Sequence, residues 1–286
     1  MKKLVLLTGA TGFVGSKIFR ALGSHDTRIR LVLRKNTDTK NIDKEFVESI
    51  IFSSDIFTEV EGWWESVCKD VDTVIHAAWY ADPRDYQHSL KNSDCLKGTI
   101  SLTKGAIAGG VRRLIGVGTC AEYESSSTPL AISARLLPLT PYAVAKVETF
   151  RALSDLCSRN GVSFAWCRLF YIFGDGEHPA RLYPYIVSQL EQGKKVNLSH
   201  GMQVRDFMEV TEVARQIVGT ALGAKTGPVN ICSGRGITVR AFAEKIADKY
   251  GDRSQLVFGE RAPNPFDPAF VVGVTHELKN PFHWNL

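Results

Sequence analysis

The sequence predicts an α/β fold built on a doubly wound parallel sheet, with a smaller C-terminal lobe. Short apolar runs alternate with longer segments of helical period, which is the pattern of repeated strand–helix units. The first apolar run is followed at once by three spaced glycines and a helical segment. The alternation becomes less regular after Gly174. We therefore expect a sheet domain over residues 1–174, and over residues 175–286 mainly a substrate-binding lobe that is partly interleaved with the sheet.

The expected elements follow in order along the chain. Apolar runs predict strands at residues 4–7, 29–33, 50–52, 73–77, 114–117 and 163–169. Helical periodicity predicts helices at residues 13–22, 86–108 and 142–160. In the second lobe we expect strands at 195–198 and 228–232, and helices near 211–224 and at 239–250.

The glycine turn between the first strand and the first helix has the spacing of a dinucleotide-binding Rossmann domain. Gly9 can take the positive φ of a tight turn, Gly12 lets the backbone approach a pyrophosphate, and Gly15 lets the helix pack closely on the strand. The unpaired N–H groups at the start of the helix favour the negative charge of the phosphates. Three glycines also occur in ordinary turns, but this strand–turn–helix order favours a nucleotide site.

The composition of the 286 residues is that of a soluble globular enzyme, with 44% apolar and 23% charged residues. The net charge of +5 is modest and the basic clusters are short, which argues against nucleic acid as a partner. No window has the ~18 apolar residues that a membrane span needs. The six cysteines form no Cys-x-x-Cys pair, so we expect no metal site and a cytoplasmic protein with reduced thiols.

Tyr142 and Lys146 are four residues apart in a helical segment, and so lie on one helix face. A lysine ammonium near a phenol lowers the pKa of the phenol toward working pH, so Tyr142 is a candidate acid–base group. Thr119 closes a strand at the sheet edge where active sites lie, and its hydroxyl could bind a substrate oxygen. In the alternative interpretation, Tyr142 and Lys146 lie on a solvated helix face and Thr119 is a turn residue. Pro141 at the helix start and the order of the motifs favour catalysis.

With these residues the chain resembles the extended short-chain dehydrogenases/reductases that act on nucleotide sugars. The resemblance covers nearly the whole chain. After the glycine turn it includes, in order, Asp55, Ile56, His76, Ala77, Ala78, Thr119, Tyr142, Lys146, Arg168, Leu169, Phe170, Gly174, Arg205, Asp206, Phe207, Asn230, Ile231, Gly234 and Trp284.

The resemblance implies a role for each matching position. Cofactor-binding residues would be Gly9, Thr11, Gly12, Phe13, Val14, Gly15, Asp55, Ile56, Ala77, Ala78, Tyr142, Lys146 and Phe170. Substrate-binding residues would be Trp79, Cys120, Ala121, Tyr171, Arg181 and Arg205, with the guanidinium of Arg205 on the substrate's diphosphate. His76 would be packed behind the cofactor and take no part in catalysis.

Departures from the family pattern argue against dehydratase activity. Dehydratases of this family carry an Asp-Glu pair directly after the catalytic threonine, and this chain has Cys120 and Ala121 there. The segment 118–123 resembles that of 4-ketoreductases of the abequose synthase-like type. Tyr171 and Cys95 stand where many members carry asparagine, which leaves the geometry of the sugar pocket open.

The end of the second strand bears on the choice of cofactor. A carboxylate there would bind the ribose hydroxyls of NAD. Here Leu33 is followed by Arg34 and Lys35, and the next acidic residue is Asp38. Two cations suit a 2′-phosphate, so NADP(H) is favoured over NAD(H). In the alternative interpretation, Arg34 and Lys35 simply lie in a solvated loop after the strand.

We therefore expect NADPH-dependent reduction of the 4-keto group of a nucleotide-linked 6-deoxyhexulose, a step of deoxysugar biosynthesis. Hydride would pass to carbon 4 while Tyr142 donates a proton, assisted by Thr119. The nearest alternative is a nucleotide-sugar 4-epimerase with tightly bound NAD. A non-catalytic nucleotide-binding protein is a further alternative, against which the intact Thr119, Tyr142 and Lys146 argue. The resemblance also suggests a homodimer through the helices at 86–108 and 142–160.

Overall fold

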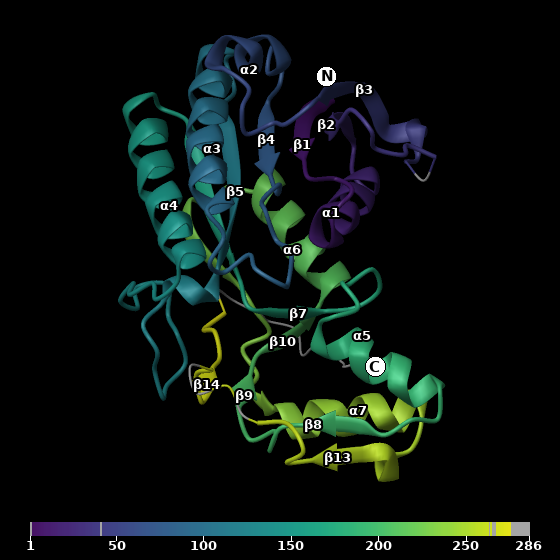
Figure 1. The fold of residues 1–286 in the computed structure, drawn as a ribbon. Coiled ribbons are helices and arrows are strands. Elements are labelled where there is room, and N and C mark those ends of the chain that lie inside the picture. Colours follow the sequence, from purple (N-terminus) through teal and green to yellow (C-terminus); the bar gives the residue numbers. More distant parts are fainter. Residues whose placement is uncertain (1, 41, 263, 265–266, 276–286) are drawn as a thin grey trace.

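A seven-stranded parallel sheet forms the centre of the molecule (Figure 1). The computed structural model describes residues 2–40, 42–262, 264 and 267–275. The strand order is β3-β2-β1-β4-β5-β6-β11. Their bounds are β1 Lys3–Thr8, β2 Thr27–Arg34, β3 Val47–Ser53, β4 Thr73–His76, β5 Arg113–Thr119, β6 Ser163–Leu169 and β11 Gly227–Ile231. The order reverses between β1 and β4, and ligands of such sheets bind in the crevice at this switch point.

Helices cover both faces of the sheet (Figure 1). α1 (Phe13–Gly23) and α6 (Val210–Leu222) lie on one face, and α2 (Glu61–Val67), α3 (Lys91–Ala108) and α4 (Pro141–Arg159) lie on the other. Along β1, Val5 and Leu7 face the first helix layer while Leu4 and Leu6 face the second, as the period of two in a strand requires. This arrangement confirms the predicted doubly wound α/β fold.

A second lobe lies beyond the carboxyl edge of the sheet. Its core joins α5 (Leu182–Glu191) and α7 (Val239–Tyr250) to the paired strands β8 (Val196–Leu198) and β13 (Leu256–Phe258). The chain passes between lobe and sheet more than once, since α6 and β11 return to the large sheet. The short elements are η1 Lys44–Phe46, η2 Cys120–Glu122, η3 Arg253–Gln255, β7 Tyr171–Phe173, β9 Val204–Arg205, β10 Phe207–Glu209, β12 Ile237–Thr238 and β14 Phe270–Val271.

Some expected elements differ from those observed. The helix expected at 86–108 begins only at Lys91, because Asp82 holds the preceding segment in turns. The Asp82 carboxylate accepts the N–H of Arg84 at 3.1 Å, and its carbonyl accepts the N–H of Tyr86 at 2.9 Å. The sequence did not predict α2 or α5. Trp284, which belongs to the resemblance, lies outside the described residues.

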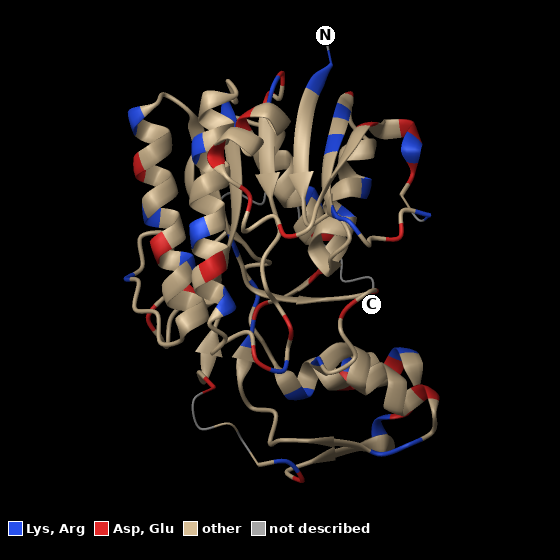
Figure 2. Ribbon diagram, turned by 45° about the horizontal axis from the view of Figure 1, so that its top comes forward, with Lys and Arg blue, Asp and Glu red and all other residues tan. Residues whose placement is uncertain are grey.

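Charged residues of both signs are interspersed along the helices, with no long run of one sign (Figure 2). None of the described helices is long and apolar enough to cross a membrane.

Candidate active site

The residues singled out in the sequence converge on one edge of the large sheet. Because its strands are parallel, their carboxyl ends meet at the same edge. The candidates at these ends are Gly9 after β1, Arg34 at the end of β2, Asp55 after β3, Ala77 after β4 and Thr119 at the end of β5.

The glycine turn is held by close backbone contacts. Gly9 has φ +76°, and a Cβ there would lie 2.7 Å from the backbone nitrogen of Ala78. A Cβ on Gly15 would lie 2.0 Å from the carbonyl oxygen of Gly9. Neither position can take a larger residue without moving backbone. Gly12 is different: it is exposed, and a Cβ there would meet only the oxygen of Gly9, at 3.4 Å.

The start of α1 fits a phosphate group. Gly12 is the N-cap, no side chain caps the helix, and the first turn carries no acidic residue. The N–H groups of that turn therefore present partial positive charge beside the glycine cradle. Thr11 is exposed, and Phe13 and Val14 are half-buried around the same turn.

The remaining cofactor candidates differ in exposure, and Ala77 and Ala78 are half-buried. Ala77 and Ala78 follow β4, and both N–H groups are tied to Thr8, at 3.3 Å to its carbonyl and 3.4 Å to its hydroxyl. Asp55 is exposed and its carboxylate accepts the N–H of Phe57 at 3.0 Å. Ile56 is buried beneath that turn.

Phe170 is buried in a hydrophobic cluster with Tyr123 and Cys232. Its ring centroid lies 6.5 Å from that of Tyr123. Phe170 therefore packs within this cluster, and its expected contact with the cofactor stays a prediction.

Arg34 and Lys35 are exposed at the end of β2. Neither side chain makes a hydrogen bond or ion pair with another residue of the described ranges. The Asp38 carboxylate is turned to the N–H of Lys40, at 2.9 Å. Both cations are thus available to an anionic ligand at this strand end.

Tyr142 and Lys146 lie one turn apart at the start of α4. Thr140 caps this helix through the N–H of Ala143, and Pro141 occupies its first turn. Lys146 is 3% exposed, and its ammonium donates to the carbonyl of Val117 at 2.8 Å.

The phenol of Tyr142 is half-buried beside Lys146 and Tyr86. Its ring meets that of Tyr86 edge-on at 4.9 Å, and the Lys146 nitrogen is 5.8 Å from its ring centroid. The side chain of Thr119 lies close enough to the phenol to lower its pKa. Thr119, Tyr142 and Lys146 therefore form one cluster at the switch-point edge.

The pKa values of Tyr142 and Lys146 differ from those expected from the sequence. Burial raises the pKa of Tyr142 above its usual value, and the neighbouring Tyr86 adds to the effect, while the Thr119 side chain opposes it. Burial lowers the pKa of Lys146 to about 7, although Glu122 acts in the other direction. We expected a pKa of Tyr142 lowered toward working pH; in this structure the net shift is upward, because burial outweighs the groups that stabilise the phenolate.

Thr119 is positioned by a buried carboxylate. Its backbone N–H donates to Glu122 at 2.9 Å, while its own hydroxyl accepts the N–H of Ala121 at 3.2 Å. Glu122 is 0% exposed, and it also accepts the Trp166 indole N–H at 2.9 Å and the Arg168 guanidinium at 2.7 Å. Since its oxygens are engaged in this way, Glu122 is not free to act as a catalytic base.

The same network continues away from the site. Arg168, which is 1% exposed, donates to the hydroxyl of Tyr123 at 3.0 Å, and that hydroxyl donates to Asn230 at 2.6 Å. The Asn230 amide donates to the carbonyl of Leu130 at 2.8 Å. The network therefore joins η2 to β6, β11 and the loop before α4.

His76 is buried and has both ring nitrogens in hydrogen bonds. One nitrogen lies 2.8 Å from the hydroxyl of Thr8 and the other 2.9 Å from that of Thr99. Burial, with a smaller effect from Lys146, lowers the pKa of His76 to about 3. His76 is thus neutral and joins β1, β4 and α3.

One substrate candidate contacts the cluster, and a second lies against Tyr86 beside it. The indole of Trp79 lies over Lys146, with 3.6 Å from the ammonium nitrogen to the ring centroid. The guanidinium of Arg181 lies over the ring of Tyr86 at 5.1 Å.

Arg205 and its neighbours lie deeper toward the second lobe. Arg205 is 1% exposed, its guanidinium donates to Asp267 at 2.6 Å, and it lies 5.0 Å from the ring of Tyr171. Cys120 is partly exposed, and burial raises the pKa of its thiol to about 12. Ala121 is exposed beside it.

Residues 5–232 match the model of the NAD dependent epimerase/dehydratase family. The chain belongs to this family. The matched segment begins within β1, includes the other six strands of the large sheet and ends one residue after β11.

Individual relatives are distant but nearly full-length. The chain is 22% identical over 276 residues to dTDP-6-deoxy-L-talose 4-dehydrogenase (NAD(+)) of Aggregatibacter actinomycetemcomitans, covering 94% of this chain and 98% of the relative. It is 23% identical over 315 residues to UDP-glucose 4-epimerase of Azospirillum brasilense, covering 98% and 86%.

Solved structures of the family share the fold. The UDP-N-acetylglucosamine 4-epimerase of Methanobrevibacter ruminantium M1, in complex with UDP-N-acetylmuramic acid, superposes with a TM-score of 0.82 at 24% identity, over 96% of this chain and 90% of that chain. The UDP-glucose 4-epimerase of Thermotoga maritima, with UDP-glucose, gives a TM-score of 0.82 at 20% identity, over 95% and 90%.

Three residues that lie at the site were not identified from the sequence: Glu122, Tyr86 and Trp166. Thr119 and Glu122 have the Ser/Thr-x-x-Glu spacing of a capping box, so a local signal for Glu122 was present. Tyr86 and Trp166 carry no such signal, since each reaches the site through the tertiary fold.

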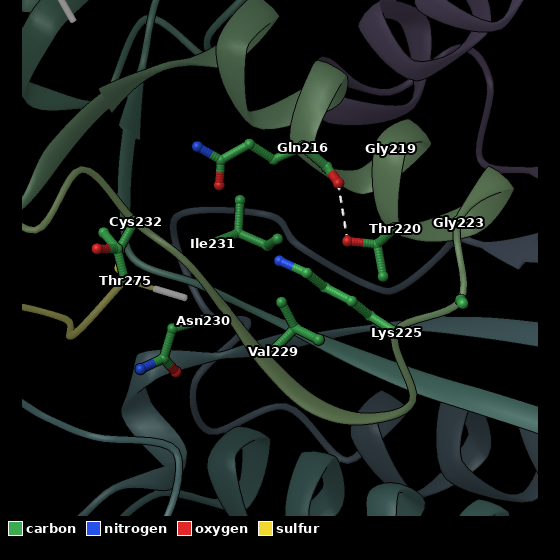
Figure 3. Close-up of a pocket in the computed structure, with 11 residues that line it drawn as sticks. Gln216, Gly219, Thr220, Gly223, Lys225, Val229, Asn230, Ile231, Cys232 and Thr275 are labelled. Atoms are coloured by element: carbon green, nitrogen blue, oxygen red, sulfur yellow. Dashed lines mark hydrogen bonds between the residues drawn. The ribbon is translucent and has the colours of Figure 1, made fainter. Parts of the chain in front are cut away.

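A separate cavity of about 340 Å³ lies between α6 and β11 (Figure 3). Gln216 and Thr220 line it from the helix and Val229 and Ile231 from the strand, with Lys225 between them. Because Thr119, Tyr142 and Lys146 do not line it, this cavity is distinct from the candidate active site. Among the described residues, no group of three or more His, Cys, Asp or Glu side chains is placed to hold a metal ion.

Proposed function

We propose that the protein reduces the 4-keto group of a nucleotide-linked 6-deoxyhexulose with NADPH. The names of its relatives support a nucleotide sugar and a reaction at carbon 4, since they include a 6-deoxytalose 4-dehydrogenase and 4-epimerases. The reduction itself rests on the residues of the site.

The observation that carries the proposal is the cluster of Thr119, Tyr142 and Lys146, next to which the described part of the chain places no free carboxylate. Elimination of water would need an additional acid or base near the sugar. Cys120 and Ala121 offer no carboxyl group, and Glu122 is held in a buried ion pair. This supports hydride transfer with a single proton donor over dehydration.

The side chains of the cluster divide the work of the reduction. When bound, the reduced nicotinamide supplies the hydride that adds to carbon 4. Tyr142 donates its phenolic proton to the oxygen on carbon 4, and the raised pKa of Tyr142 keeps it in the protonated form that reduction requires. Thr119 orients the phenol, and the ammonium of Lys146 stabilises the phenolate that remains.

The chain's own residues fit a phosphorylated dinucleotide. The turn at Gly9, Gly12 and Gly15 leaves room for a pyrophosphate at the start of α1. Arg34 and Lys35 would bind a ribose 2′-phosphate, because they are exposed cations without a partner among the described residues. This supports NADP(H) over NAD(H).

The closest rival is a 4-epimerase, which the names of several relatives favour. Stoichiometry separates the two. We expect the purified protein to oxidise one NADPH for each 4-keto-6-deoxy sugar nucleotide reduced, with deuterium from labelled cofactor found at carbon 4 of the product. A panel of such substrates with different bases and sugars would identify the preferred one, and a Tyr142→Phe protein is the control.

A different outcome of the same assay would identify an epimerase. A protein isolated with bound NAD that interconverts two 4-hydroxy sugar nucleotides, with no added cofactor, is an epimerase and not a reductase.

A further inference from the structure

Lys146 faces the indole ring of Trp79. Its ammonium nitrogen lies 3.6 Å from the ring centroid, well inside the ~6 Å within which a cation is attracted by an aromatic face. Trp166 and Tyr142 are more distant, with their ring centroids at 5.8 Å. Trp79 therefore supplies the closest π face to this cation.

The charge of Lys146 lacks the usual counter-ion. The side chain is 3% exposed, and its hydrogen bond goes to the neutral carbonyl of Val117. No carboxylate among the described residues forms an ion pair with it. An ammonium is costly in such a site unless another group compensates.

The titratable groups that face Lys146 come from each neighbouring element. His76 on β4 is neutral, Cys95 on α3 is a thiol whose pKa burial raises to about 11, and Tyr142 on α4 is a neutral phenol. Among the described residues, Glu122 in η2 is the carboxylate that raises the pKa of Lys146, and it is already paired with Arg168. Burial is the largest effect and leaves the pKa of Lys146 at about 7.

The indole is held in place from behind. Its N–H donates to the side chain of Asn92 at 2.9 Å, and Asn92 is 2% exposed. The amide of Asn92 donates in turn to the carbonyls of Tyr86 and Ser89, at 2.6 and 2.9 Å. Phe57 meets the indole edge-on at 6.5 Å. The ring plane is therefore fixed by Asn92 in the first turn of α3 and by the ring of Phe57.

We propose that Trp79 is a positioning residue that keeps Lys146 charged through its indole face, with Asn92 as the anchor of that face. Trp79 was expected to bind substrate; here one face of its indole is taken by the lysine. The inference rests on the proposed function only for its catalytic consequence, since an uncharged Lys146 would no longer stabilise the phenolate of Tyr142.

The direction of the effect follows from the charge. An aromatic face favours the ammonium over the neutral amine, so it raises the pKa of Lys146 against the lowering caused by burial. Replacing Trp79 with leucine removes the π face but keeps an apolar side chain. We expect the midpoint of the Lys146 titration to fall by about one pH unit. If Trp79 served only to exclude water, its loss would instead raise the midpoint.

The test is an NMR titration of the full chain labelled with ¹³C at lysine Cε, in which the Lys146 resonance is the one missing from a Lys146→Met protein. Trp79→Leu is expected to titrate at lower pH than the unmodified protein. Trp79→Phe, which keeps a weaker π face, should fall between the two and replaces the leucine variant if that one does not fold. Trp63→Leu is the matched control, because Trp63 lies on α2 against Trp64 and does not contact Lys146.

An unchanged or higher midpoint in Trp79→Leu overturns the proposal. So does a midpoint in Trp79→Phe as low as in the leucine variant, because the aromatic face would then have no effect. The titration needs no substrate, so a lowered midpoint stands even if the protein proves not to be a reductase. If it is one, the alkaline limb of kcat/KM should move to lower pH in Trp79→Leu by the same amount as the NMR midpoint.

Discussion

Replacing Arg168 with leucine tests the buried network that positions Thr119. Arg168 and Glu122 are 1% and 0% exposed, and their guanidinium and carboxylate are 2.7 Å apart. Removing the arginine leaves a carboxylate in the core with the N–H groups of Thr119 and Trp166 as its remaining donors. We expect the loss of most of the catalytic rate and a large loss of stability.

The loss of stability in Arg168→Leu can be estimated in two ways. The charged hydrogen bond to Glu122 contributes ~1.5–3 kcal/mol, and the bond from Arg168 to the hydroxyl of Tyr123 contributes about 1 kcal/mol. Breaking a buried ion pair by removing one partner costs ~3–5 kcal/mol as a whole. The first route gives about 2.5–4 kcal/mol and the second ~3–5 kcal/mol, so we expect a loss of roughly 3–4 kcal/mol, a large part of the ~5–15 kcal/mol by which a typical domain is stable.

Urea unfolding followed by tryptophan fluorescence and circular dichroism would measure this loss. The matched control is Arg151→Leu, since the Arg151–Glu148 pair on α4 is 63% and 49% exposed and should contribute less than about 0.5 kcal/mol. A double variant, Glu122→Leu with Arg168→Leu, should be more stable than Arg168→Leu alone, because it leaves no unpaired charge. If Arg168→Leu costs no more than the Arg151 control at an unchanged m-value, the network does not stabilise this part of the fold.

Three further changes probe the cofactor and the chemistry. Tyr142→Phe keeps the ring but removes the proton donor, so the rate should fall by ~10²–10⁴ with cofactor affinity nearly unchanged; a variant that keeps more than a tenth of the rate, with chemistry limiting, excludes the phenol from catalysis. Arg34→Asp should shift the preference between NADPH and NADH by roughly ten- to hundredfold toward NADH, as expected for a lost charged hydrogen bond, and equal binding of both by the unmodified protein would contradict the assignment. Gly15→Ala places a Cβ 2.0 Å from the carbonyl of Gly9, and should cost about 1–3 kcal/mol of stability and weaken dinucleotide binding. Gly62→Ala on α2, where a Cβ meets nothing within 4 Å, is its control and should be neutral or slightly stabilising.

Local patterns in the sequence determined much of the fold and the identity of the candidate residues. Alternating apolar runs predicted the strands of the large sheet, because a strand buried on both faces must be apolar throughout. The glycine spacing predicted a turn, and the structure shows the positive φ at Gly9 and the close backbone approach at Gly15. Tyr142 and Lys146 were placed on one helix face, since four residues make about one turn.

Only the tertiary structure decided the environment of these residues. Trp79 lies 67 positions before Lys146 and Asp267 lies 62 after Arg205, yet each pair is in contact. The pKa of Tyr142 was predicted with the wrong sign because burial depends on the whole fold, whereas the spacing to Lys146 is a local property. A sequence pattern specifies which groups share a helix face or a strand end, but the charge that each group carries depends on distant residues that exclude water and supply its hydrogen bonds.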